Sequence, residues 1–149
     1  MYEYLSDVLR AKRINPEDVE LIRHTDTGKD PEHRFQRAQQ AGFLKEYTGM
    51  QRAGFAENRD YLMVFIGEPP TTARFYALYY ILNRFPTRAG HIPANYPNKS
   101  EVEAEGEYLE LREEPLPPGL KGFVIDWGKS TVAWHQRATN EKPIIEITE

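Results

Sequence analysis

The sequence predicts an α+β fold in which N-terminal helices pack on a mainly antiparallel sheet or partial barrel of five to seven strands. Patterns typical of helices are concentrated in the first 48 residues, whereas short apolar and aromatic runs typical of strands dominate after Asp60. The two kinds of pattern do not alternate, so a parallel sheet built from βαβ units is not expected. With 149 residues, the chain is expected to form a single domain over residues 1–149.

The N-terminal segment predicts a short helix, a turn and a strand. Three apolar residues recur at helical spacing and indicate a helix over residues 5–12: Leu5, Val8 and Leu9. Asn15 followed by Pro16 is typical of a capped turn or a single helical turn. Residues 19–24 then have the composition of a strand.

A second helix is expected from Asp30 to Thr48. Asp30 can cap its first turn, and Pro31 suits the first helical position. The helix is expected to end before Gly49, and its apolar stripe is imperfect because Gly42 interrupts it.

The rest of the chain predicts strands separated by loops rich in proline and glycine. These strands are expected over residues 61–66, 74–82, 108–112, 123–127, 132–137 and 144–147. The run from Glu101 to Glu114 alternates glutamate with apolar or small residues, as a solvated edge strand does. Pro115, Pro117, Pro118 and Gly119 indicate a turn after it.

Both tryptophans lie in the stretch VIDWGKSTVAWHQR, residues 124–137, which is expected to form a hairpin around Gly128. With a loop of four residues, Ile125 would lie opposite Trp134 and Val124 opposite His135. Trp127 and Trp134 could both belong to the core, or one of them could line a pocket. A nucleotide-binding loop is not expected, because Phe123 stands where the phosphate-loop pattern needs its first glycine and β-type residues follow the turn.

The composition excludes several kinds of chemistry. The chain has no cysteine, which rules out disulfides, thiolate catalysis and zinc sites with sulfur ligands. None of the four histidines is paired with another at the short spacing of metal ligands, and no serine lies in a nucleophile motif. We therefore expect no catalytic residue, no metal and no cofactor in this chain.

Charge and hydropathy predict a cytoplasmic protein without a membrane partner. No apolar run approaches the roughly 20 residues that span a bilayer, and no signal peptide opens the chain. The formal net charge is −4. Seven glutamates against Lys99 and Arg112 give residues 99–120 a charge of −5, which leaves about +1 for the remainder. The acidity therefore does not exclude a nucleic-acid surface elsewhere on the chain.

The order of short motifs resembles the N-terminal, non-catalytic domain of bacterial GIY-YIG nuclease family proteins. The similarity spans nearly the whole chain and includes LIRH at residues 21–24, YLMVFIG at 61–67, residues 75–81, IPAN at 92–95, VIDWG at 124–128, Trp134, QRA at 136–138 and residues 144–147. The resemblance implies that the nuclease domain begins where this chain ends. It also implies a DNA-targeting module of a restriction-type endonuclease, with the nuclease in the same polypeptide or in a separate one.

The leading hypothesis is a nucleic-acid recognition domain that acts on DNA, plain or with modified bases. Arginines would contact phosphates, and an exposed tryptophan would stack on a base. The candidate residues are Arg23, His24, Arg74, Arg84, Arg88, Trp134, His135 and Arg137. Two alternatives stay open: a protein-interaction or structural module, for which the acidic edge and the proline-rich loops are the cue, and a small-molecule-binding domain or unrecognised enzyme.

Overall fold

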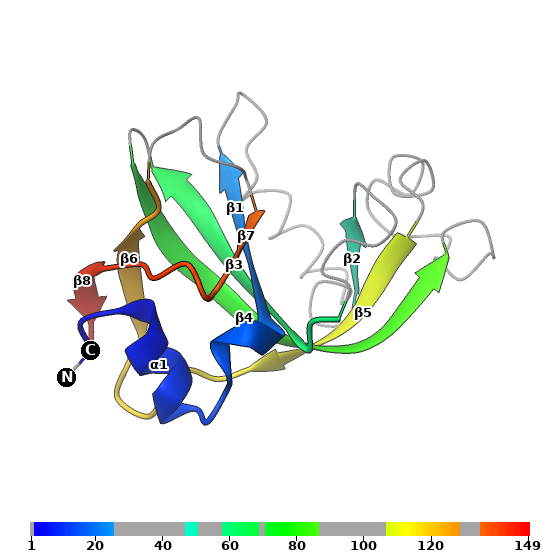
Figure 1. The fold of residues 1–149 in the computed structure, drawn as a ribbon, viewed down its shortest axis with the longest axis horizontal. Coiled ribbons are helices and arrows are strands. Elements are labelled where there is room, and N and C mark those ends of the chain that lie inside the picture. Colours follow the sequence, from blue (N-terminus) through cyan, green and yellow to red (C-terminus); the bar gives the residue numbers. More distant parts are fainter. Residues whose placement is uncertain (1, 26–46, 51–57, 69–70, 87–106, 129–134) are drawn as a thin grey trace.

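The computed structural model describes residues 2–25, 47–50, 58–68, 71–86, 107–128 and 135–149. In this part of the chain, one α-helix, α1 (Leu5–Ala11), and one 3-10 helix, η1 (Pro16–Asp18), accompany eight strands (Figure 1). The strands are β1 (Val19–Thr25), β2 (Tyr47–Met50), β3 (Tyr61–Glu68), β4 (Thr72–Pro86), β5 (Glu107–Glu114), β6 (Gly122–Asp126), β7 (His135–Arg137) and β8 (Ile144–Thr148).

These strands form one open, mixed sheet. Its main path runs β2-β5-β4-β3-β1-β7, and β6 joins it through β4 and carries β8 on its other edge. β1 and β3 are parallel, and the other described pairs are antiparallel. The expected α+β fold, with N-terminal helices packed on a sheet or partial barrel, is therefore wrong. The described residues form mostly strand, with a single seven-residue α-helix.

The second expected helix, from Asp30 to Thr48, is wrong at its end. Residues 30–46 lie outside the described part of the chain, but Tyr47 and Thr48 belong to β2 and pair with Glu110 and Leu109 of β5. Tyr and Thr favour strands, and cross-strand pairing outweighs the imperfect helical stripe that precedes them.

The expected hairpin between residues 123–127 and 132–137 is also wrong. β6 already has β4 on one edge and β8 on the other, so β7 pairs with β1 instead. Gly128 adopts a φ of 106°, a left-handed conformation that glycine accepts readily, and the chain leaves β6 there.

The acidic run was predicted to form an edge strand, but the first half of β5 has a neighbouring strand on each side. Glu107–Glu110 lies between β2 and β4, whereas residues 101–106 lie outside the described part of the chain. The alternation of glutamate with apolar residues indicated a strand correctly, but it does not reveal how many neighbours the strand has.

The sheet has an apolar cluster on each face. Strand alternation divides β3 between them, because Met63 and Phe65 belong to one cluster and Leu62, Val64 and Ile66 to the other. We call the face with Met63 the inner face, since its cluster includes Leu5, Val8 and Leu9 of α1, and the opposite one the outer face. The continuous apolar run in β3 thus reflects a strand that is buried on both sides.

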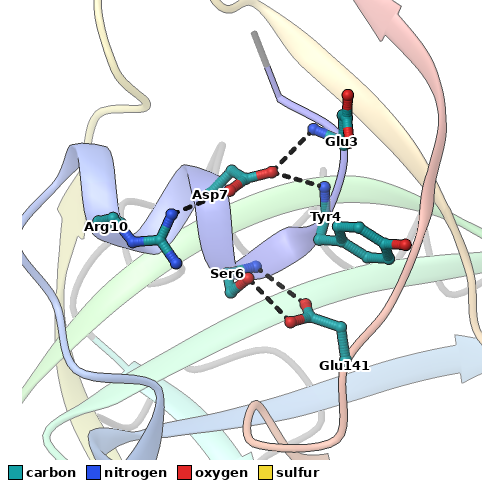
Figure 2. A network of polar contacts seen from close by, with 6 residues as sticks. All are labelled: Glu3, Tyr4, Ser6, Asp7, Arg10 and Glu141. Carbon is teal, nitrogen blue, oxygen red and sulfur yellow. Dashed lines mark hydrogen bonds and ion pairs between the residues drawn. The ribbon is translucent and has the colours of Figure 1, made fainter.

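Carboxylates anchor the N-terminal end of α1 (Figure 2). Asp7 Oδ2 accepts hydrogen bonds from the backbone N–H groups of Glu3 and Tyr4, both at 2.9 Å. Glu141, from the segment before β8, accepts from the Ser6 hydroxyl at 2.9 Å and from the Ser6 N–H at 3.3 Å. Negative charge is favourable at this end of a helix, so these contacts fix α1 to the C-terminal segment.

Candidate nucleic-acid interface

Arg23, a predicted DNA contact, is part of the interior. It lies on the inner face in β1, two residues after Leu21, and only 5% of it is exposed. Its Cζ lies 5.3 Å from the centroid of the Trp127 ring. Burial lowers the pKa of this guanidinium from its ordinary value. Arg23 therefore acts as a cation packed on an indole ring and not as an open surface charge.

Trp127 belongs to the core, which decides between the two interpretations of this residue. Its exposed fraction is 0%, and its ring centroid lies 6.0 Å from that of Phe65. Its backbone N–H donates to the carbonyl of Thr71 at 2.7 Å, which fixes the end of β6 beside the start of β4. This indole therefore offers no surface on which a base could stack.

Lys142 is a buried cation that the sequence did not indicate. Its Nζ donates a 2.8 Å hydrogen bond to the Trp127 carbonyl and lies 5.4 Å from the centroid of the indole ring. Burial lowers the pKa of this ammonium; Asp126 opposes that shift, and the positive charge of Arg23 adds to it. Lysine is almost never this deeply buried, so no sequence pattern would have placed Lys142 here. Arg23, Trp127 and Lys142 are called the Trp127 cluster below.

Gln136 adds a buried polar group to the inner face. It lies opposite Leu21 in the β1–β7 ladder and is 9% exposed. Its Oε1 accepts a long hydrogen bond of 3.4 Å from Asn140, and its Nε2 has no hydrogen-bond partner among the described residues.

Register assigns Arg74 and Arg137 to the outer face and gives the ladder positions of His24 and His135. Arg137 lies opposite Glu20, and His135 lies opposite Ile22. His24 and Arg74 share a row across three strands, because both are paired with Ile66 of β3. Residues directly opposite each other in a ladder belong to the same face of the sheet. The fold therefore brings together segments that are about 50 and 60 residues apart in the sequence.

Among the described residues that were predicted to contact DNA, Arg74 and Arg137 are the cations of this face that solvent can reach. Arg137 is exposed and Arg74 is half-buried. Between them lie Ile22 and Ile66, which are buried in the outer apolar cluster. Glu20, opposite Arg137, is 6% exposed, and its carboxylate lies 3.6 Å from Arg59. Arg59 and Arg137 thus lie beside Glu20 at this margin, which gives a local charge of about +1.

The remaining candidates do not join this group. Arg84 lies near the opposite end of β4, paired with Leu109 of β5. Arg88 and Trp134 lie outside the described residues. Within the described ranges, no cluster of three or more His, Asp or Glu residues could hold a metal ion. No helix in the same ranges is both long enough and apolar enough to cross a membrane.

Comparison of the chain with protein-family models, with curated proteins and with solved structures gave no match.

Proposed function

We propose that this chain is a non-catalytic nucleic-acid recognition domain that contacts DNA through Arg137 of β7 and Arg74 of β4, at two margins of the outer face. The observation that carries the proposal is the register of these strands. It assigns Arg74 and Arg137 to one face, and it pairs His24 with Ile66 and His135 with Ile22 in the same ladders, although these residues come from three separate segments of the sequence. Arginine is the side chain best suited to phosphate oxygens, and it positions a protein on a DNA backbone.

The spacing of the two accessible arginines suits a backbone contact. Three strand spacings and four residues of strand length separate Arg74 from Arg137 in the ladders, which corresponds to about 20 Å between their backbones. Phosphates along one DNA strand follow each other at about 3.4 Å of helix rise. Because the phosphates also wind around the helix axis, a straight distance of about 20 Å corresponds to phosphates roughly three to four nucleotides apart on one strand.

The stacking role in this proposal belongs to Trp134 and not to Trp127. Trp127 is sealed beneath Arg23 and Lys142, whereas Trp134 directly precedes His135 at the start of β7. The proposal also includes a partner nuclease of the GIY-YIG type, in the same polypeptide or in a separate one. Support for that partner is the resemblance of the sequence motifs alone.

A direct test is fluorescence anisotropy with a labelled duplex of about 20 base pairs, plain and with modified cytosines, at about 50 mM salt. Arg74→Ala and Arg137→Ala are each expected to raise Kd about three- to ten-fold. Arg10→Ala is the matched control: its side chain is 76% exposed and lies on α1, away from the outer face, so Kd should not change.

The two function classes give different outcomes in the same experiment. Absence of any anisotropy change with all duplexes at low salt would overturn the proposal. If the chain then self-associates in analytical ultracentrifugation, the alternative of a protein-interaction module becomes the better account. Equal weakening by Arg10→Ala would show that binding is nonspecific attraction to any surface arginine.

A further inference from the structure

A cavity lies beside the middle of β4, away from the Trp127 cluster. Both β5 and β6 pair along the same edge of β4, but β5 begins its pairing at Leu78 and β6 ends its pairing at Arg74. The connection between them contains three prolines and Gly119, whose φ of 86° turns the chain outward. The two strands therefore diverge beside residues 75–77 and leave a cavity of about 490 Å³. This volume is within the range of small-ligand sites.

The wall formed by β4 is aromatic and firmly held. Phe75 and Tyr76 line the cavity beside the buried Leu78. The Phe75 ring stacks on Phe123 with centroids 5.1 Å apart and an interplanar angle of 17°. It also meets Phe65 edge to face at 6.1 Å, so its position is fixed before any ligand arrives.

The opposite wall carries charged groups of both signs. Glu113 and Glu114 at the end of β5 line the cavity, together with Lys121 and three apolar residues of the connection: Pro115, Leu116 and Leu120. Arg112 binds Glu114 Oε1 through Nε at 3.0 Å and Nη2 at 2.8 Å. The Cζ of Arg112 also lies 5.0 Å from the centroid of the Tyr80 ring. This contact and the hydrogen bonds position the Glu114 carboxylate. Arg112 thus offsets the charge of Glu114, so the net charge of this wall is about zero and Glu113 is the lining carboxylate that can attract a cation.

We infer that this cavity binds an organic cation, an alkylammonium or guanidinium head on an apolar stem. Aromatic faces attract such heads through the ring quadrupole, carboxylates accept their N–H bonds, and Leu116 and Leu120 offer apolar surface to the stem. An arginine or lysine side chain of a partner protein and a free small cation share this chemistry. The inference is independent of the proposed DNA contacts, since none of Arg74, Arg137, His24 or His135 lines the cavity.

The test is an NMR titration of the full chain with Nα-acetyl-arginine methylamide and with its neutral citrulline analogue. The arginine compound is expected to shift the amide signals of Phe75–Leu78 and of Leu120 and Lys121 in a saturable way, whereas the citrulline compound is not. Equal shifts with both compounds, or no shifts, would overturn the inference. Butylguanidinium and a short glycine-flanked arginine peptide then separate the two sources: equal affinity assigns a free cation, and tighter binding of the peptide assigns a partner side chain.

Two exposed residues of the lining allow changes of charge without disturbing the core. Glu113→Gln is expected to weaken binding about two- to five-fold, and Lys121→Glu to strengthen it by a similar factor. Glu17→Gln is the control, because Glu17 is exposed in η1 and does not line the cavity. Affinity that does not respond to either charge change would contradict recognition of a cation at this site.

Discussion

Lys142 Nζ donates a 2.8 Å hydrogen bond to the carbonyl oxygen of Trp127 and lies 5.4 Å from the centroid of the same residue's indole ring. Arg23 contacts that ring as well, at 5.3 Å. Three distant segments of the chain, β1, the end of β6 and the segment before β8, therefore meet at one buried aromatic side chain. The structure holds two cations in its interior at this point, and the burial of a charge costs free energy.

Stability should rise with pH in the alkaline range because Lys142 is buried. Burial holds the pKa of this ammonium below its ordinary value of 10.5. Between the lowered pKa and 10.5, the unfolded chain binds more protons than the folded chain, so the free energy of unfolding increases with pH. Urea denaturation at several pH values from about 7.5 to about 10 should show this rise in the wild type and not in Lys142→Met. Identical slopes in the two proteins would contradict the buried ammonium.

The burial of Trp127 can be measured by fluorescence once the other tryptophan is removed. The chain has two tryptophans, so Trp134→Phe leaves Trp127 as the sole indole fluorophore. Because Trp127 is 0% exposed, its emission should lie at shorter wavelength than that of the unfolded protein and should resist quenching by acrylamide until the protein unfolds. Efficient quenching in the folded protein would show that the indole is open to solvent.

Tyr79 predicts an opposite pH dependence at still higher pH. Burial raises the pKa of its phenol well above the ordinary value of 10.0, and the charges of Glu113 and Tyr76 raise it further. Above pH 10, the unfolded chain therefore loses this proton first, and the free energy of unfolding falls as pH rises. Tyr79→Phe should reduce that fall in denaturation experiments between pH 10 and about 11. An unchanged alkaline profile would place the Tyr79 hydroxyl in water.

The contacts of Asp7 predict a contribution of α1 to stability that is lost in acid. The backbone N–H of Tyr4, and then that of Glu3, hold the pKa of this carboxyl below its ordinary value of 3.8. Its contribution is therefore present above pH 3.8 and disappears as pH falls through the lowered pKa. At neutral pH, Asp7→Asn removes the negative charge near the N-terminus of α1 and is expected to cost about 0.3–1 kcal/mol in the free energy of unfolding. The difference in the free energy of unfolding between Asp7→Asn and the wild type should vanish in strong acid. A difference that does not change with pH would show that the Asp7 charge is not its cause.

Much of the local structure was predictable because strand and helix patterns depend on neighbouring residues. The helix at residues 5–12, the capped turn at Asn15 and Pro16, and the strand at residues 61–66 are confirmed as α1, η1 and β3. In η1, the Asn15 side chain accepts from the Glu17 N–H at 3.0 Å, which is the capping contact that this residue type favours. Boundaries differ by a few residues, and β4 is longer than predicted.

Strand pairing was not predictable, because it depends on residues far apart in the chain. Proximity in sequence favoured a hairpin of β6 with the strand that follows it, yet β7 pairs with β1 through Glu20 and Arg137. The same pairing decides the candidate site, since it assigns Arg137 to the outer face and leaves Arg23 on the inner face with Trp127. A residue list can name arginines suited to phosphates, but the face that each one occupies follows from register.

The salt dependence of DNA affinity tests the central claim most directly. If Arg74 and Arg137 each neutralise one phosphate, the slope of log Kd against log salt concentration for the Arg74→Ala/Arg137→Ala double variant should be smaller than that of the wild type by about two. The Arg10→Ala control should keep the wild-type slope. A double variant that retains both the wild-type slope and the wild-type affinity would contradict DNA recognition by the outer face of this sheet.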